Sequence, residues 1–211
     1  KGNNLVLGSS TTELSFSQKV RISDKASQII TGTGILNLTG GLQLERGYVS
    51  ASGGSLNIGA GSLVSSAGIL DLSDGVFSMN AGLAVQGTLR INTGSGIQFS
   101  ENILDLTAGT LETGGTVSLD GISLGSGTLL RLNSDTVLSS SNPFELSTIN
   151  FQRHRLKLDT EATDLTLEGN LIIEIPGEEG FAVTFCKPDH LRGRQSASHV
   201  TPPPAACSGQ C

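Results

Sequence analysis

The sequence repeats one phrase at a fixed interval: Ile35-Leu36-Asn37-Leu38 returns as Ile69-Leu70-Asp71-Leu72 and again as Ile103-Leu104-Asp105-Leu106, at the same spacing each time. Each copy is followed by Ser or Thr, one variable residue and Gly. A tandem repeat of about 34 residues indicates units that cannot bury their apolar faces alone and therefore stack on their neighbours. The phrase predicts a solenoid.

Apolar and polar residues alternate throughout the repeats, as in Leu56-Asn57-Ile58, Leu89-Arg90-Ile91 and Val117-Ser118-Leu119. A period of two residues is typical of strands that bury one face. Gly, Asn and Ser interrupt these runs every few residues, which favours turns and leaves no window for an amphipathic helix. We therefore expect an all-β fold with essentially no helix between residues 32 and 141.

The length of the repeat bears on how the chain winds. A single coil of about 34 residues, at about 3.3 Å per residue, would be roughly 110 Å around, too wide for side chains to fill. A second L-x-L in the units, at Leu56 and Leu89, favours about two coils per repeat. In that arrangement Leu36, Leu70 and Leu104 would stack on one another inside the solenoid.

Composition divides the chain further. Residues 32–127 hold 21 of the 28 glycines and only nine charged residues. We expect N-terminal strands or a cap over residues 1–34, three tandem repeats over 35–136, less regular coils over 137–186, and a flexible tail containing proline and cysteine over 187–211. The chain does not begin with Met and carries no secretion leader, so we also expect a fragment or a processed form.

The net charge of −6 makes a nucleic-acid partner unexpected, because phosphate binding needs clustered Lys and Arg. The one basic cluster, Arg153-His154-Arg155 with Lys157, is interpreted as a solvated strand edge rather than an anion site. The sequence contains no run of about 18 apolar residues, so no transmembrane helix is expected. No nucleotide, zinc or calcium-repeat motif occurs, so no cofactor and no metal site are predicted.

One set of polar residues is a candidate site. Asn37, Asp71 and Asp105 hold the outward position of the same phrase, which predicts a polar column with members about 9.6 Å apart if each repeat makes two coils. Two readings stay open for this column. It is a set of solvated positions that keeps the exterior soluble, or it is a ligand-facing row for calcium or a polysaccharide.

The texture of the repeats resembles a known group of proteins. The G-x-L-x-[LI] phrases, such as Gly54-Ser55-Leu56-Asn57-Ile58 and Gly87-Thr88-Leu89-Arg90-Ile91, together with Leu-Thr-Gly-Gly at 38–41, are similar to bacterial surface β-solenoids. These include autotransporter passengers and filamentous-haemagglutinin-like adhesins. The resemblance covers roughly residues 32–135. It implies a right-handed parallel β-helix, a secreted or cell-surface location, and an adhesive or spacer role.

We therefore expect a non-enzymatic structural or adhesive segment of a larger secreted or cell-surface bacterial protein. Its expected partners are a host-surface or glycan ligand, or neighbouring solenoid segments of the same protein. The alternative is a carbohydrate-active β-helix enzyme, a polysaccharide lyase or a glycoside hydrolase. Such an enzyme needs carboxylates, or an Arg and Asp set, that converge in a groove, whereas the acids of this chain are scattered singly.

Overall fold

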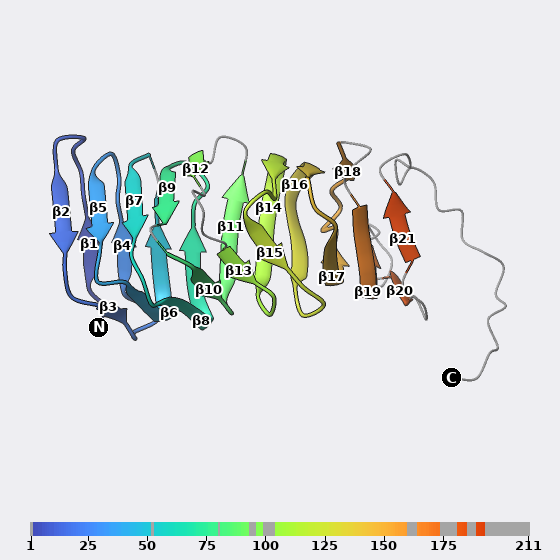
Figure 1. The fold of residues 1–211 in the computed structure, drawn as a ribbon, viewed down its shortest axis with the longest axis horizontal. Coiled ribbons are helices and arrows are strands. Elements are labelled where there is room, and N and C mark those ends of the chain that lie inside the picture. The colour runs from blue at the N-terminus through green and yellow to red at the C-terminus, as the bar shows by residue number, and fades with distance from the viewer. Residues whose placement is uncertain are drawn as a thin grey trace, which may run out of the picture.

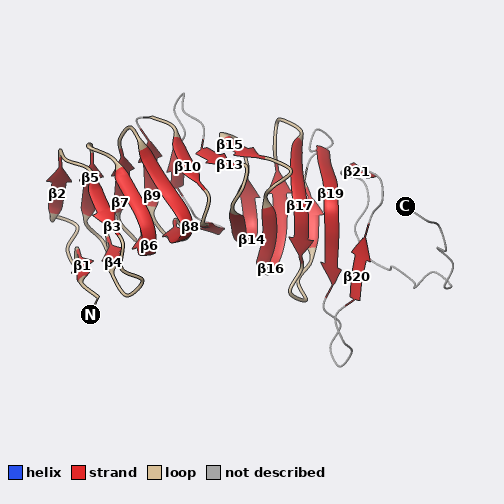
Figure 2. Cartoon of the chain, turned by 90° about the horizontal axis from the view of Figure 1, so that it is seen from below, coloured by secondary structure: helices blue, strands red, loops and turns tan. Residues whose placement is uncertain are grey.

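The chain forms a β-solenoid in the computed structural model, which describes residues 2–51, 53–79, 81–92, 96–98, 104–159, 164–173, 181–184 and 189–192. From β1 (Asn4–Val6) to β19 (Asp164–Ile173), strands of neighbouring coils pair in parallel and stack along the long axis of the molecule (Figure 1). No helix occurs among these residues, and Figure 2 accordingly shows only strands and loops. The predicted all-β parallel solenoid is confirmed.

Each coil of the solenoid has three sides. Leu36 pairs with Leu56 and Leu56 pairs with Phe77, so the residue number advances by 20 and then by 21 from one coil to the next. Between these residues the chain passes two other sides, where Leu44 pairs with Val64 and Val49 pairs with Leu70. We call the three sides side 1, side 2 and side 3 in the order in which the chain first meets them.

The strands fall on the three sides as follows. Side 1 holds β1 (Asn4–Val6), β4 (Gln28–Ile30), the second parts of β6 (Leu42–Ser50) and β8 (Ser62–Asp71), β11 (Thr88–Asn92), the first parts of β14 (Thr110–Ser118) and β16 (Leu129–Ser139), and the second parts of β17 (Phe144–Asn150) and β19 (Asp164–Ile173). Side 2 holds β2 (Glu13–Phe16), β5 (Ile35–Leu38), β7 (Ser55–Ile58), β9 (Val76–Met79) and β12 (Gly96–Gln98), then the second parts of β14 and β16, and β18 (Leu156–Leu158). Side 3 holds β3 (Val20–Ile22), the first parts of β6 and β8, β10 (Leu83–Val85), β13 (Leu104–Leu106) and β15 (Ile122–Leu124), then the first parts of β17 and β19.

The three-sided coil changes the meaning of the 34-residue repeat. Because one coil of three sides uses about 20 positions of the chain, a repeat of 34 residues covers about five sides, which is less than two whole coils. The repeated phrase therefore falls on a new side each time: Leu36 lies in β5 on side 2, Leu70 in β8 on side 1, and Leu104 in β13 on side 3. The prediction that these leucines stack on one another is wrong, although all three are fully buried.

The glycines of the repeat follow the same rule. Gly41 lies between β5 and β6, Gly75 between β8 and β9, and Gly109 between β13 and β14, so each occupies a different corner. At Gly75 the corner touches the coil before it, because an added Cβ would lie 1.4 Å from the carbonyl oxygen of Ala51. The repeat thus preserves the local geometry of a corner.

The core consists of aliphatic columns along the inside of each side. On side 1 the buried column comprises Ile29, Val49, Leu70, Leu89, Leu111, Leu130 and Ile149, each in register with the next. Burial of each such side chain stabilises the fold by about 1.5 to 3 kcal/mol relative to exposure. Hydrophobic stacking between coils is therefore the main source of stability.

The N-terminal strands continue the solenoid, whereas the last described strands pair in the opposite direction. Residues 1–34, predicted as N-terminal strands or a cap, contain β1 to β4, which pair into the same sheets as the repeats. Beyond residue 180, β20 (Phe181–Thr184) and β21 (Asp189–Arg192) both pair antiparallel with β19. The rest of the predicted flexible tail over 187–211 lies outside the described residues. Within the described part of the chain, no helix has the length and apolarity needed to cross a membrane.

Candidate functional site: an ion-pair ladder on side 1

The three residues of the predicted polar column lie on three different sides of the solenoid. Asn37 is on side 2 in register with Asn57, Asp71 is on side 1 in register with Arg90, and Asp105 is on side 3 in register with Ala84. The column prediction is therefore wrong, because it assumed that one repeat completes a whole number of coils. Each of the three residues has its own surroundings.

Asn37 belongs to a hydrogen-bonded polar row on side 2. Its Nδ2 donates to Glu13 Oε1 at 2.8 Å and to Ser15 Oγ at 3.1 Å in the preceding coil. Asn57 Nδ2 donates to Asn37 Oδ1, and Ser78 Oγ donates to Asn57 Oδ1. Side-chain amides and hydroxyls thus join four successive coils along this side.

Asp71 and Asp105 share a local role at the ends of their strands. The backbone N–H of Ser73 donates to Asp71 Oδ1 at 3.0 Å, and the N–H of Thr107 donates to Asp105 Oδ1 at 3.0 Å. An Asp that accepts a hydrogen bond two residues ahead stabilises a turn. The repeated acid is therefore explained by turn formation at each corner, which needs no alignment between repeats.

Asp71 also begins a row of alternating charges across four coils of side 1. In register order the row is Asp71, Arg90, Glu112 and Arg131, which we call the ion-pair ladder. Arg90 Nε lies 2.6 Å from Glu112 Oε2, Arg131 Nη1 lies 2.7 Å from Glu112 Oε1, and Arg90 Nη1 lies 3.8 Å from Asp71 Oδ2. Tyr48 Oη donates to Asp71 Oδ2 at 2.7 Å and extends the ladder by one coil.

Glu112 is the centre of the ladder. Its side chain is 7% exposed, whereas those of Arg90 and Arg131 are 34% and 38% exposed. Burial disfavours the carboxylate, but the hydrogen bonds and charges of the two arginines outweigh this effect and hold the pKa of Glu112 below its ordinary value. Glu112 therefore stays ionised at neutral pH.

The pKa values of the neighbouring groups Tyr48 and Arg90 are also shifted away from neutral pH. Burial, together with the hydrogen bond to Asp71, raises the pKa of the Tyr48 hydroxyl. Burial opposes the charge on Arg90, but its contacts with Glu112 and Asp71 leave the pKa of the guanidinium raised. General acid–base catalysis works best when the pKa lies near the working pH. Neither an acid nor a base of this kind is formed by Tyr48, Arg90 or Glu112.

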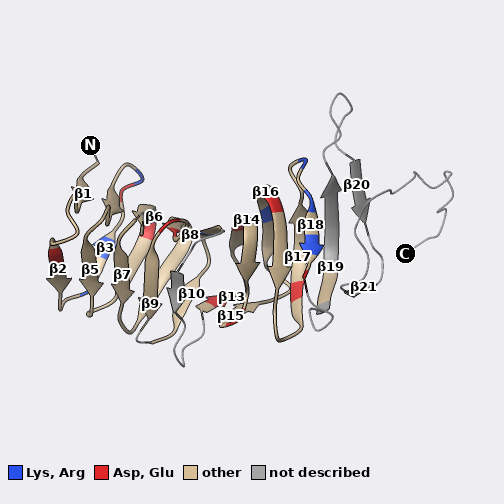
Figure 3. Cartoon of the chain, turned by 90° about the horizontal axis from the view of Figure 1, so that it is seen from above, with Lys and Arg blue, Asp and Glu red and all other residues tan. Residues whose placement is uncertain are grey.

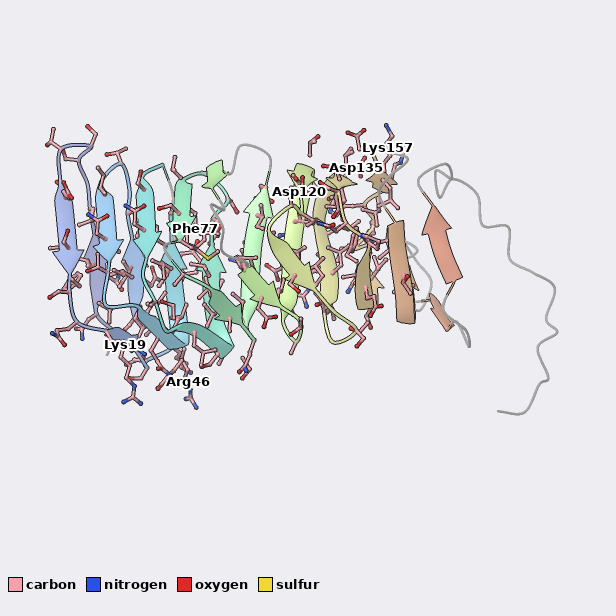
Figure 4. All side chains as sticks on the ribbon, in the orientation of Figure 1. Lys19, Arg46, Phe77, Asp120, Asp135 and Lys157 are labelled. Carbon is pink, nitrogen blue, oxygen red and sulfur yellow. The ribbon has the colours of Figure 1, made fainter. Side chains whose placement is uncertain are left out.

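Charged groups outside the ladder are sparse. Figure 3 shows acidic and basic residues scattered along the described strands. Most residues in these strands are neither acidic nor basic. In Figure 4, Lys19 and Arg46 extend away from the solenoid at its lower edge, where both are exposed. Among the described residues, no three His, Cys, Asp or Glu side chains come close enough together to hold a metal ion.

No protein-family model, curated protein or solved structure matches this chain. The structure supports one part of the resemblance to bacterial surface proteins, namely the β-solenoid arrangement.

The ladder was missed in the sequence because its members are spaced by the coil and not by the repeat. Asp71, Arg90, Glu112 and Arg131 follow one another at intervals of 19, 22 and 19 positions. An alternation of sign at these intervals is the signal that could have identified the ladder once the coil length was known. The longer spacing of the repeated phrase hides it.

The ladder predicts an acid-dependent contribution to stability. Because the native pKa of Glu112 is lowered, this contribution is fully present above the ordinary Glu value of 4.5 and is lost as the pH falls through the lower native pKa. We expect Glu112→Gln to cost about 2 kcal/mol at neutral pH, the size of a charge-assisted hydrogen bond, and progressively less in acid. Urea unfolding at about pH 3 to 7 measures this difference, with the exposed Glu145→Gln as the control. A cost for Glu112→Gln that is the same at both ends of the range contradicts this account.

Proposed function

We propose that this chain is a non-enzymatic structural or adhesive segment of a larger secreted or cell-surface bacterial protein, of the kind represented by autotransporter passengers and filamentous-haemagglutinin-like adhesins. The observation that carries the proposal is the ion-pair ladder. Its charges bind one another across successive coils, and Glu112 has both carboxylate oxygens occupied by arginines. Such a ladder joins coils to each other. Each carboxylate oxygen of Glu112 is already paired with an arginine.

The stacking pattern supports a mechanical role for the segment. The aliphatic columns inside and the polar rows outside both connect each coil to the next. A rod whose adjacent units are joined on several sides transmits force along its axis and holds whatever it carries at a fixed distance. These properties suit a spacer or the shaft of an adhesin.

The rival function, a polysaccharide lyase or hydrolase, requires different electrostatics. A hydrolase needs a carboxylic acid with a raised pKa beside a second carboxylate. In this chain the pKa of Glu112 is lowered by its two arginines, and that of Asp120 is lowered by hydrogen bonds from Ser141 and Ser118. Both shifts go in the direction opposite to that of a proton donor.

A turnover assay tests the proposal. The purified chain is incubated with acidic and neutral polysaccharides, with and without calcium, while unsaturated products and new reducing ends are followed. We expect neither to accumulate above the level of a heat-denatured sample. Turnover that is abolished by Glu112→Gln or by Asp71→Asn, in variants whose circular-dichroism melts show a retained fold, would establish the enzyme instead.

A further inference from the structure

The three sides of the solenoid are not equally continuous. Side 1 pairs without a break from β1 to β19. Side 2 is divided, because its first five strands form a separate sheet whose last member, β12, has no pairing with β14 among the described residues. Side 3 is divided one coil later. There β15 pairs with β13 and β17 pairs with β19, but in the part of the chain that the structure describes no pairing joins β15 to β17.

Both interruptions lie next to the coil formed by β14 and β15. The step into this coil, from β11, β12 and β13, keeps its pairing on sides 1 and 3 but not on side 2. The step out of it, to β16 and β17, keeps its pairing on sides 1 and 2 but not on side 3. Figure 2 shows β6 to β9 inclined relative to β16 to β19, on either side of these two steps. Side 1 is therefore the one side whose pairing crosses both steps among the described strands.

A cavity occupies the interruption on side 3. It has a volume of about 330 Å³ and lies between β15 and the start of β17, with Ile122, Leu124 and Phe144 in its lining. Ile122 and Leu124 are only partly buried, whereas Leu104 and Leu106, their register partners in β13, are completely buried. Side chains that line a void lose dispersion contacts with the neighbours they would otherwise pack against. The coils are therefore held together less tightly on side 3 at this step.

The ion-pair ladder crosses the same two steps on the continuous side. Glu112 belongs to β14, Arg90 to β11 and Arg131 to β16, so the central carboxylate is bound from the coil before it and from the coil after it. Hydrogen bonds between charged groups are short and roughly twice as strong as those between neutral groups. Bending at either step changes the spacing of the coils on side 1, and it therefore strains one of these two contacts.

We propose that the two steps around β14 form a hinge between two stacks of coils, and that the ion-pair ladder restrains this hinge. The first stack runs from β1 to β13 and the second from β16 to β19. Bending occurs where sides 2 and 3 are unpaired, while the continuous sheet of side 1 holds the stacks together. Within the first stack all three sides pair from coil to coil, so this stack moves as one body. A hinge of this kind goes beyond the proposed function, because it is compatible with an adhesive segment and with an enzyme alike.

Distances between pairs of spin labels test the hinge. Labels coupled to ketone-bearing amino acids at Ser66 in β8 and Glu145 in β17 span both steps and leave the native cysteines unchanged. Labels at Thr11 and Gln86 form the control pair, because both positions lie within the first stack and are also several coils apart. All four residues are exposed. Double electron–electron resonance gives the distribution of distances for each pair.

We expect Glu112→Gln to widen the distribution between positions 66 and 145 about twofold or more, and to leave that between positions 11 and 86 unchanged. The matched control variant is Glu45→Gln, which removes the ion pair with Arg21 inside the first stack and is expected to change neither distribution. Arg131→Gln removes the contact across the later step alone and is expected to widen the first distribution by less. Because the Arg131 side chain is partly exposed, this variant also decides the question if Glu112→Gln does not fold.

Two results overturn the hinge, in variants whose circular-dichroism melts show a retained fold. One is a distribution between positions 66 and 145 that is as narrow without the ladder contacts as with them. The other is equal widening of both distributions, since the whole solenoid would then loosen instead of bending at β14. The turnover assay is independent of these distances, so failure of the proposed function can be distinguished from failure of the hinge.

Discussion

Leu70→Asp is expected to abolish the cooperative thermal transition of the solenoid. Leu70 is fully buried on side 1 between Val49 of the preceding coil and Leu89 of the following one. An aspartate at this position would place a carboxylate among aliphatic side chains with no cation to pair with it, which costs at least about 4 kcal/mol. The middle coils are then the first to separate.

Circular dichroism during heating measures this effect, with Ser66→Asp as the matched control. Ser66 lies in the same strand, β8, but its side chain is exposed at a corner. We expect the free energy of unfolding of the control to lie within about 0.5 kcal/mol of that of the original chain, as is usual for surface substitutions. If Leu70→Asp melted as the control does, the inward assignment of side 1 would be incorrect.

Gly75→Ala is expected to destabilise the chain by about 3 kcal/mol or more, although it adds one methyl group. The new Cβ would overlap the backbone carbonyl of Ala51, and a backbone atom in a stacked coil cannot move aside as a flexible side chain can. The overlap can be relieved only if two coils separate at this corner. The expected loss is therefore larger than that of an ordinary Gly-to-Ala change.

Gly8→Ala provides the comparison, because a Cβ at Gly8 meets no other atom within 4 Å. We expect this variant to be neutral or slightly more stable, since alanine reduces the freedom of the unfolded chain. Urea unfolding of both variants measures the difference between them. Equal stabilities for the two variants would refute the close approach of coils at Gly75.

Much of the fold could be predicted from local pattern, because alternation along a strand reports directly on which face is buried. The buried leucines Leu36, Leu70 and Leu104 and the parallel stacking of coils follow from that alternation. The coil length could not be obtained in the same way. The sequence similarity reports the 34-residue unit, whereas the coil is set by how many short sides enclose a core that side chains can fill.

The predicted polar column was wrong because the coil length was not known from the sequence. Alignment of Asn37, Asp71 and Asp105 required the repeat to contain a whole number of coils, and it contains about five sides instead. The ladder of Arg90, Glu112 and Arg131 depends on contacts between neighbouring coils whose charges alternate, so no similarity between repeats marks it. Only the position of each strand in space brings these charges together.

One repeat covers about five successive sides of the three-sided solenoid, and this affects how a longer array of such repeats would contact a partner. A feature encoded once per unit emerges on a different side in each successive unit and returns to its original side only after three units, which is five coils or about 24 Å along the axis. A flat partner lying against one side would therefore touch every third copy. Recognition by a single side is sparse, while the rod as a whole displays the same feature all around its circumference, so that its orientation about its own axis ceases to matter.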